Sequence, residues 1–117
     1  MKRLHQQIAI VTGASSGIGQ GVAIALAKAG ANVCVNYRSS EDGAKKTLRE
    51  IEKNGGEGFI QQADVSQPED VKSMFRNTIE KYGTVDILVN NAGIQQDAPF
   101  LEMEHDGFNL HYLCRKK

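Results

Sequence analysis

The chain has 117 residues, enough for one domain with a core of useful size. Its 14 Lys and Arg balance its 14 Asp and Glu, so a nucleic-acid or membrane-surface partner is not expected. No apolar run approaches the roughly 18 residues of a membrane span, and no signal peptide is recognisable. Cys34 and Cys114 lack metal-ligand spacing, which predicts a cytoplasmic protein with reduced cysteines and no metal site.

The first expected elements are a strand at residues 8–11, a glycine-rich turn, and an alanine-rich helix at residues 20–29. A second strand is expected at residues 32–36. The helix after it has Ser39 or Ser40 as its cap, acids in its first turn, and an end near residues 54–56. A third strand at residues 58–63 completes this part of the pattern.

Residues 66–69, Ser-Gln-Pro-Glu, are typical of a capping box with proline in the first turn. The helix that they begin should end near Gly83, before an almost wholly apolar fourth strand at residues 85–89. Strands that alternate with crossover helices predict an α/β fold with a doubly wound, Rossmann-type parallel sheet in the order 3-2-1-4. We expect one domain over residues 1–117, incomplete after about the fourth strand, with an atypical tail at about 102–117.

The glycine-rich turn has the pattern expected of a phosphate cradle. It lies between a strand and a helix, where backbone N–H groups and the helix dipole favour an anion. A side chain on its glycines would meet the pyrophosphate or block tight packing. A glycine-rich turn without a ligand is the structural alternative. The candidate cofactor-binding residues are Thr12, Gly13, Ser15, Ser16, Gly17, Ile18 and Gly19.

Two further motifs follow other strands. Asn90-Asn91-Ala92-Gly93 comes directly after the fourth strand, where ligands of open α/β sheets bind, although alone it would pass as an ordinary turn. We take Asn91, Ala92 and Gly93 as site candidates. Asp64 and Val65, which end the third strand, are further candidate cofactor-binding residues; the alternative for Asp64 is a turn residue that begins the next helix.

The Gly-x-x-x-Gly-x-Gly spacing after Thr12, with the Asn-Asn-Ala-Gly turn, resembles the short-chain dehydrogenase/reductase family over residues 7 to about 98. Residues 36–39, Asn-Tyr-Arg-Ser, look most like the glucose 1-dehydrogenase and 3-oxoacyl-carrier-protein reductase branches. The resemblance implies hydride transfer between a nicotinamide and a small alcohol or carbonyl substrate, a homo-oligomer, and contact of Asp64 with the adenine amino group.

The cofactor that we predict is NADP, with NAD possible. An acid at the end of the second strand, about 20 residues beyond the loop, would bind the ribose 2′-hydroxyl of NAD. That place falls at Tyr37, which we take as a candidate cofactor-binding residue with Arg38 and Ser39, and residues 36–40 include no carboxylate. Arg38 offers a charged planar fork to a 2′-phosphate, and Ser39 adds a hydroxyl donor. The alternative for Arg38 is an exposed surface arginine.

The resemblance also implies catalytic residues that we do not find. The family has an upstream serine and a Tyr-x-x-x-Lys motif well past the fourth strand. Tyr112 and Lys116 match that motif literally but lie too close to Asn91, so we assign no catalytic residue. Two hypotheses remain: the cofactor-binding half of an oxidoreductase, or a non-catalytic dinucleotide-binding fragment that partners longer homologues. A nucleotide-free receiver-like domain would need an acidic pocket after the first strand.

A sheet that stops at the fourth strand would leave an apolar strand at its edge. Such edges recruit other chains, so we expect the isolated chain to be marginally stable or prone to aggregation.

Overall fold

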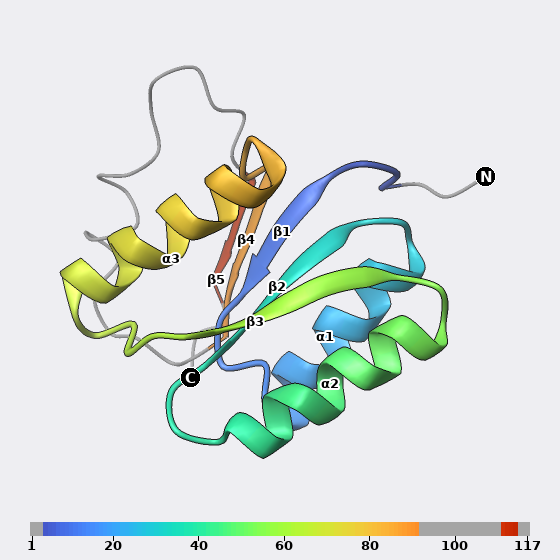
Figure 1. Ribbon diagram of the computed structural model, residues 1–117, viewed down its shortest axis with the longest axis horizontal. Coiled ribbons are helices and arrows are strands. Elements are labelled where there is room, and N and C mark those ends of the chain that lie inside the picture. The colour runs from blue at the N-terminus through green and yellow to red at the C-terminus, as the bar shows by residue number, and fades with distance from the viewer. Residues whose placement is uncertain (1–3, 92–110, 115–117) are drawn as a thin grey trace.

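The computed structural model describes residues 4–91 and the backbone of residues 111–114. In this part of the chain, one parallel sheet of five strands has the order β3-β2-β1-β4-β5 (Figure 1). Its strands are β1 (Ile8–Val11), β2 (Asn32–Tyr37), β3 (Glu57–Gln62), β4 (Ile87–Asn90) and β5 (His111–Cys114). Three helices, α1 (Gly17–Lys28), α2 (Glu41–Lys53) and α3 (Pro68–Tyr82), connect the first four strands. The predicted α/β class and the order of those four strands are confirmed.

Helices cover both faces of the sheet, with α1 and α2 on one side and α3 on the other (Figure 1). Successive strand residues therefore enter two separate cores. Ala9 and Val11 of β1 pack with α1 and α2, whereas Ile10 between them packs with α3. The side chains of β2 and β4 also alternate between the two cores. Those that pack in the core with α1 and α2 are Val33, Val35, Ile87 and Val89.

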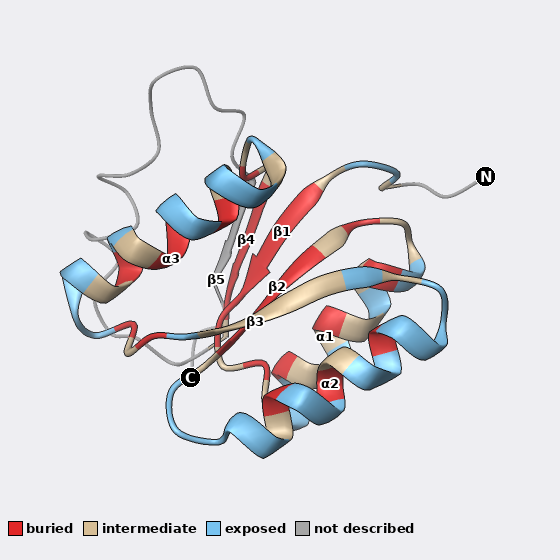
Figure 2. Cartoon of the chain, viewed as in Figure 1, coloured by how far each residue is buried: buried red, intermediate tan, exposed pale blue. Residues whose placement is uncertain are grey.

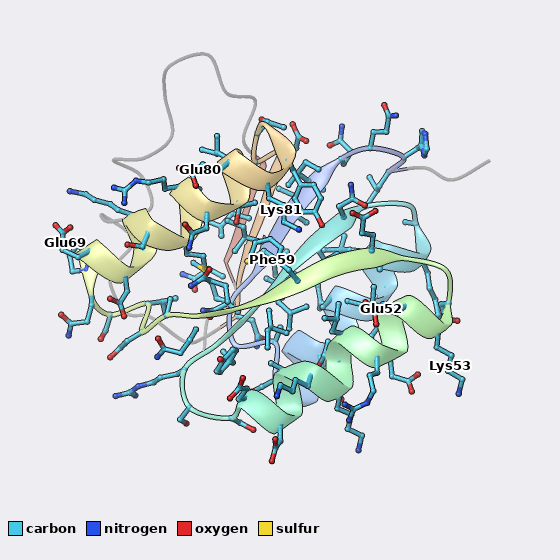
Figure 3. All side chains as sticks on the ribbon, viewed as in Figure 1. Glu52, Lys53, Phe59, Glu69, Glu80 and Lys81 are labelled. Carbon is cyan, nitrogen blue, oxygen red and sulfur yellow. The ribbon has the colours of Figure 1, made fainter. Side chains whose placement is uncertain are left out.

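The buried residues follow the central strands and the sheet-facing sides of the helices (Figure 2). Helix α1 meets the sheet through the small side chains of Ala23 and Ala27, which allow a close approach. Helix α3 contributes Met74 and Phe75 to the opposite core. Each large side chain fully buried in this way contributes about 1.5–3 kcal/mol to stability. Glu52 and Lys53 of α2 and Glu69 and Glu80 of α3, labelled in Figure 3, are exposed.

The predicted capping box at residues 66–69 is wrong. Gln67 is the N-cap of α3, and it makes no side-chain capping bond, while Pro68 occupies the first turn as expected. The Ser66 hydroxyl instead donates to Asp64 Oδ1 at 2.7 Å, and the Ser66 N–H donates to the same oxygen at 3.0 Å. The nearby carboxylate satisfies Ser66 before the helix begins. At its other end the helix stops, as predicted, at Gly83 in the left-handed conformation (φ 92°).

The expectation that the fourth strand forms the sheet edge is also wrong. Strand β5 pairs in parallel with β4, from Ile87 opposite His111 to Asn90 opposite Cys114. The apolar β4 is thus paired on both sides, as its composition requires. Part of the tail expected to be atypical supplies this strand, and residues 102–110 and 115–117 lie outside the described residues.

Candidate dinucleotide site

The candidate residues gather at the carboxyl ends of β1, β2, β3 and β4. Strand β1 lies between β2 and β4. Helix α1 leads from β1 to β2 on one face of the sheet, whereas α3 leads into β4 on the other face. That switch point is where open α/β sheets bind ligands. Thr12 to Gly19 follow β1, Arg38 and Ser39 follow β2, Asp64 follows β3, and Asn91 follows β4. Ala92 and Gly93 lie outside the described residues.

Thr12 joins the loops after β1 and β4. It is fully buried, and its N–H donates to Val89 O at 3.0 Å. Its hydroxyl donates to Asn90 Oδ1 at 3.1 Å and accepts from the Asn91 N–H at 2.9 Å. Asn91 Nδ2 in turn donates to Gly13 O at 3.2 Å. Thr12 therefore positions the site from beneath it and is not exposed to a ligand.

The three glycines of the turn serve different purposes. Gly13 and Gly17 have φ angles of 62° and 60°, which other L-residues rarely adopt. A Cβ on Gly19 would lie 2.2 Å from Gly13 O and 2.5 Å from Asn91 Nδ2, so this glycine allows α1 to pack against both loops. A Cβ on Gly17 would meet nothing within 4 Å and would project into the open space in front of the helix. The space in front of Gly17 fits the close approach of a phosphate.

The N-terminus of α1 is equipped for an anion. The first N–H groups of any helix have no partner within the helix. The N-cap of α1, Ser16, makes no side-chain capping bond, and no acidic residue stands in the first turn. In α2, by contrast, Ser40 Oγ accepts from the Gly43 N–H, and both α2 and α3 carry two acids in the first turn. Among the described helices, α1 alone offers an unblocked positive end beside a glycine turn.

Asp64 has the role expected of a turn residue and also contacts Arg38. Ser66 donates to its Oδ1, and Arg38 Nε lies 3.6 Å from its Oδ2. These bonds, chiefly that from the Ser66 hydroxyl, hold the pKa of the Asp64 carboxyl below its ordinary value. Val65 is buried in the core beneath α3, so its side chain does not line the site.

Arg38 stands where the 2′-phosphate of NADP was predicted. Its side chain is 77% exposed, and Asp64 holds it through Nε alone. An ion pair this exposed is weak. Ser39 is exposed beside it, whereas Tyr37 is half-buried against the core shared with α1 and α2. Of the two predicted caps for α2, Ser40 is the one used.

Ile18 is the exposed large hydrophobic residue of the site. It is 57% exposed, which sets it apart from the other large apolar side chains in the described part of the chain. It follows Gly17 in the first turn of α1. An apolar group in this position suits contact with a flat, partly apolar ligand.

Three residues that position the loop were missed at the level of sequence: Asn36, Gly43 and Thr47. The fully buried Thr47 hydroxyl of α2 donates to Ala14 O at 2.8 Å and accepts from Gln20 Nε2 of α1 at 2.8 Å. A polar residue in the apolar stripe of α2, beside Ala44, Leu48 and Ile51, was the available signal. Asn36 gave a similar signal, because it interrupts an apolar strand.

No cluster of three or more metal-ligating side chains occurs within residues 4–91. Over those same residues, no helix is long and apolar enough to cross a bilayer.

Comparison with known proteins decides the family. The family described as short chain dehydrogenase matches residues 7–112. The chain belongs to this family. A solved short-chain dehydrogenase from Burkholderia cenocepacia, in complex with NADP, superposes with a TM-score of 0.76 at 40% identity over 81% of this chain.

Two curated relatives show how much of the family's length is present. A 3-oxoacyl-[acyl-carrier-protein] reductase of Synechocystis is 44% identical over 89% of this short-chain dehydrogenase chain but only 42% of the relative. A short-chain dehydrogenase/reductase homolog of Bacillus subtilis is 47% identical over 84% of this chain and 90% of the relative. The chain thus spans about two-fifths of the length of the reductase and nearly all of the second relative.

Proposed function

We propose that this short-chain dehydrogenase chain binds NADP(H) at the carboxyl edge of its sheet and supplies the cofactor-binding part of an oxidoreductase. The observation that carries the proposal is the start of α1 at Gly17, which has no side-chain cap, no acidic residue in its first turn and open space beside Gly17. Arg38, exposed at the end of β2 where no carboxylate stands, adds the preference for a 2′-phosphate.

Each part of the cofactor has residues that fit it. The first-turn N–H groups of α1 would hold the pyrophosphate, and Ile18 would contact an apolar ring. The terminal nitrogens of Arg38 and the Ser39 hydroxyl would bind the 2′-phosphate. Asp64, held as a carboxylate, would accept from the adenine amino group. Asn91, whose Oδ1 is buried without a partner in the described residues, offers a further acceptor at the same edge.

The bound nicotinamide would accept or donate the hydride when an alcohol or carbonyl compound reacts. NADP is found in the Burkholderia structure, and reduction of an oxoacyl group is named for the Synechocystis relative. For this chain we propose the same cofactor and a small alcohol or carbonyl substrate, such as a sugar or an oxoacyl group, in a homo-oligomer.

A second candidate function is cofactor binding without turnover, in partnership with longer relatives. The match to a relative of which the chain covers 90% favours this candidate. Assays of NADPH oxidation with a panel of carbonyl compounds separate the two. Turnover would establish the oxidoreductase, whereas saturable binding without turnover would support the partner role.

NADPH fluorescence titration tests cofactor binding, which both candidate functions require. We compare the unmodified chain with Gly17→Val, whose branched side chain would fill the open space before α1. Gly55→Val is the matched control, because Gly55 also has a positive φ (81°) and open surroundings but lies just after the end of α2, away from the site. Binding should be saturable, weakened at least tenfold by Gly17→Val and retained in the control, since one lost phosphate contact costs about 1.5–3 kcal/mol. No saturable signal from the unmodified chain would reject the proposal.

A further inference from the structure

Asn36 is a buried amide near the end of β2, only 2% exposed, and it follows the buried apolar residues Val33, Cys34 and Val35. Its Oδ1 accepts from the Gly13 N–H at 3.1 Å. Its Nδ2 donates to Gln61 O and to Ala63 O, each at 3.2 Å. One side chain thus connects the glycine turn, β2 and the end of β3.

These bonds decide which amides of the glycine turn face a ligand. The Gly13 N–H is engaged by the Asn36 side chain, and the Ala14 N–H donates to the Asn36 carbonyl at 2.8 Å. Neither amide is therefore available to a phosphate. Beyond these two amides, donors for an anion include the first N–H groups of α1, which begins at Gly17.

An amide is the side chain that this position needs. Its surroundings present one N–H donor and two carbonyl acceptors, and an amide supplies the complementary acceptor and donors. A carboxylate of the same shape could accept from Gly13 but could not donate to Gln61 or Ala63. An apolar side chain would leave all three buried groups without this partner, which is costly.

We propose that Asn36 is a positioning residue, which fixes the glycine turn so that the amides of the first turn of α1 meet the pyrophosphate. This inference rests on the proposed NADP(H) binding. Asn36 acts on the pyrophosphate end selectively, because other bonds hold the adenosine end. The Ala63 N–H donates to Tyr37 O at 3.0 Å, and β2 and β3 pair from Asn32 to Tyr37 independently of this side chain.

The test compares Asn36→Ala with Asn32→Ala, its matched control at the opposite end of the same strand. Two probes are titrated: NADPH, and adenosine 2′-phosphate, which lacks the pyrophosphate. In Asn36→Ala, the dissociation constant of NADPH should rise about tenfold, whereas that of adenosine 2′-phosphate should change less than twofold. The control should change neither. Equal weakening of both probes, or of neither, would overturn the proposal.

Amide hydrogen exchange of the unmodified chain tests the same inference if Asn36→Ala does not fold. Without cofactor, the Gly13 amide should exchange slowly and the Gly17 and Ile18 amides fast. NADPH should then protect Gly17 and Ile18 while leaving Gly13 unchanged. A Gly13 amide that becomes protected only with NADPH would be a phosphate donor, and the proposal would be wrong.

The two proposals fail in different ways. If NADPH does not bind the unmodified chain at all, the proposed function fails, while slow exchange at Gly13 still supports the bond to Asn36. If NADPH binds and Asn36→Ala weakens both probes alike, only the positioning role fails.

Discussion

The contact between Arg38 and Asp64 joins two residues that were expected to bind different parts of one cofactor. The ion pair uses Nε of Arg38, and 77% of the arginine side chain is exposed. A weak surface pair of this kind orients the guanidinium without neutralising it. The alternative of a plain surface arginine describes its exposure correctly, but its position after β2, where no carboxylate stands, agrees with a 2′-phosphate ligand.

Arg38→Ala should therefore change cofactor selectivity. The dissociation constant of NADPH should rise about tenfold, since a charge-assisted hydrogen bond is lost. That of NADH should stay within about twofold, because a 2′-hydroxyl carries no charge for the guanidinium to meet. Fluorescence titration with both cofactors measures the ratio, and Arg49→Ala on the exposed face of α2 is the control. Equal losses for both cofactors would show that Arg38 does not contact the 2′-phosphate.

Cys34 should be inert in the folded protein. The thiol is buried without a disulfide, and burial raises its pKa to about 12, although a hydrogen bond with Thr78 acts in the opposite direction. The test uses the variant Cys114→Ser, in which Cys34 is the one remaining cysteine. At pH 8 a thiol reagent should label the native variant far more slowly than the denatured variant. Rapid labelling of the native chain would contradict this.

The same thiol gives the stability of the fold a pH dependence. The unfolded chain loses the Cys34 proton near the ordinary pKa of 9.0, whereas the folded chain keeps it to about 12. Unfolding therefore releases a proton between these values, and the free energy of unfolding should fall as the pH rises through that window. Urea titrations from pH 8 to 11 should show the fall, with a shallower one for Cys34→Ala. An unchanged slope in that variant would remove Cys34 as a cause.

At the scale of elements, α2 is docked closely on the glycine turn. A Cβ on Gly43 would lie 2.4 Å from Ser15 O, so the start of α2 can approach only without a side chain there. Gly43→Ala should destabilise the fold by about 1–3 kcal/mol through overpacking, despite the better helix propensity of alanine. Gly21→Ala is the matched control: it is an exposed glycine of α1 with nothing within 4 Å, and it should stabilise by up to about 1 kcal/mol. Urea unfolding of both variants measures the difference. Similar effects at the two positions would show that α2 can shift freely.

Much of the element order follows from local sequence. The apolar run at residues 8–11 predicts β1 with its observed bounds, and Gly83 ends α3 as expected. The start of α1 was placed too late, because Gly17 and Gly19 are poor helix formers whose reason for being there is the site. The capping box failed because Asp64, outside the motif, binds Ser66 first.

The positioning residues could not be predicted in the same way. Asn36, Gly43 and Thr47 act on the glycine turn across separations of 23 residues or more, as in the bonds from Gly13 to Asn36 and from Thr47 to Ala14. Their role depends on how α2 and β2 pack, which local propensity does not contain. The motif residues themselves were recognisable because a short loop carries them together.

At the scale of the molecule, the two sheet edges are β3 and β5 rather than β4. Free edges invite pairing with other chains unless they carry charge or are covered. Strand β3 begins and ends with exposed Glu57 and Gln62. Phe59 lies between these two residues in β3, and Lys81 Nζ of α3 is 5.7 Å from the centre of its ring. Both Phe59 and Lys81 are labelled in Figure 3. A charged side chain on an edge strand, here Glu57, disfavours pairing with a second strand.

Strand β5 then decides whether the apolar β4 is protected. Its residues pair with β4 along the whole of that strand, from Ile87 to Asn90. Removing residues 111–117 should expose the N–H and C=O groups of β4, lower the melting temperature and produce soluble oligomers in size-exclusion chromatography. Removing residues 115–117 alone is the control and should leave elution and melting unchanged, because β5 is kept. If both shortened chains elute alike, β5 does not protect β4, and the apolar strand must owe its protection to the helices that cover its faces.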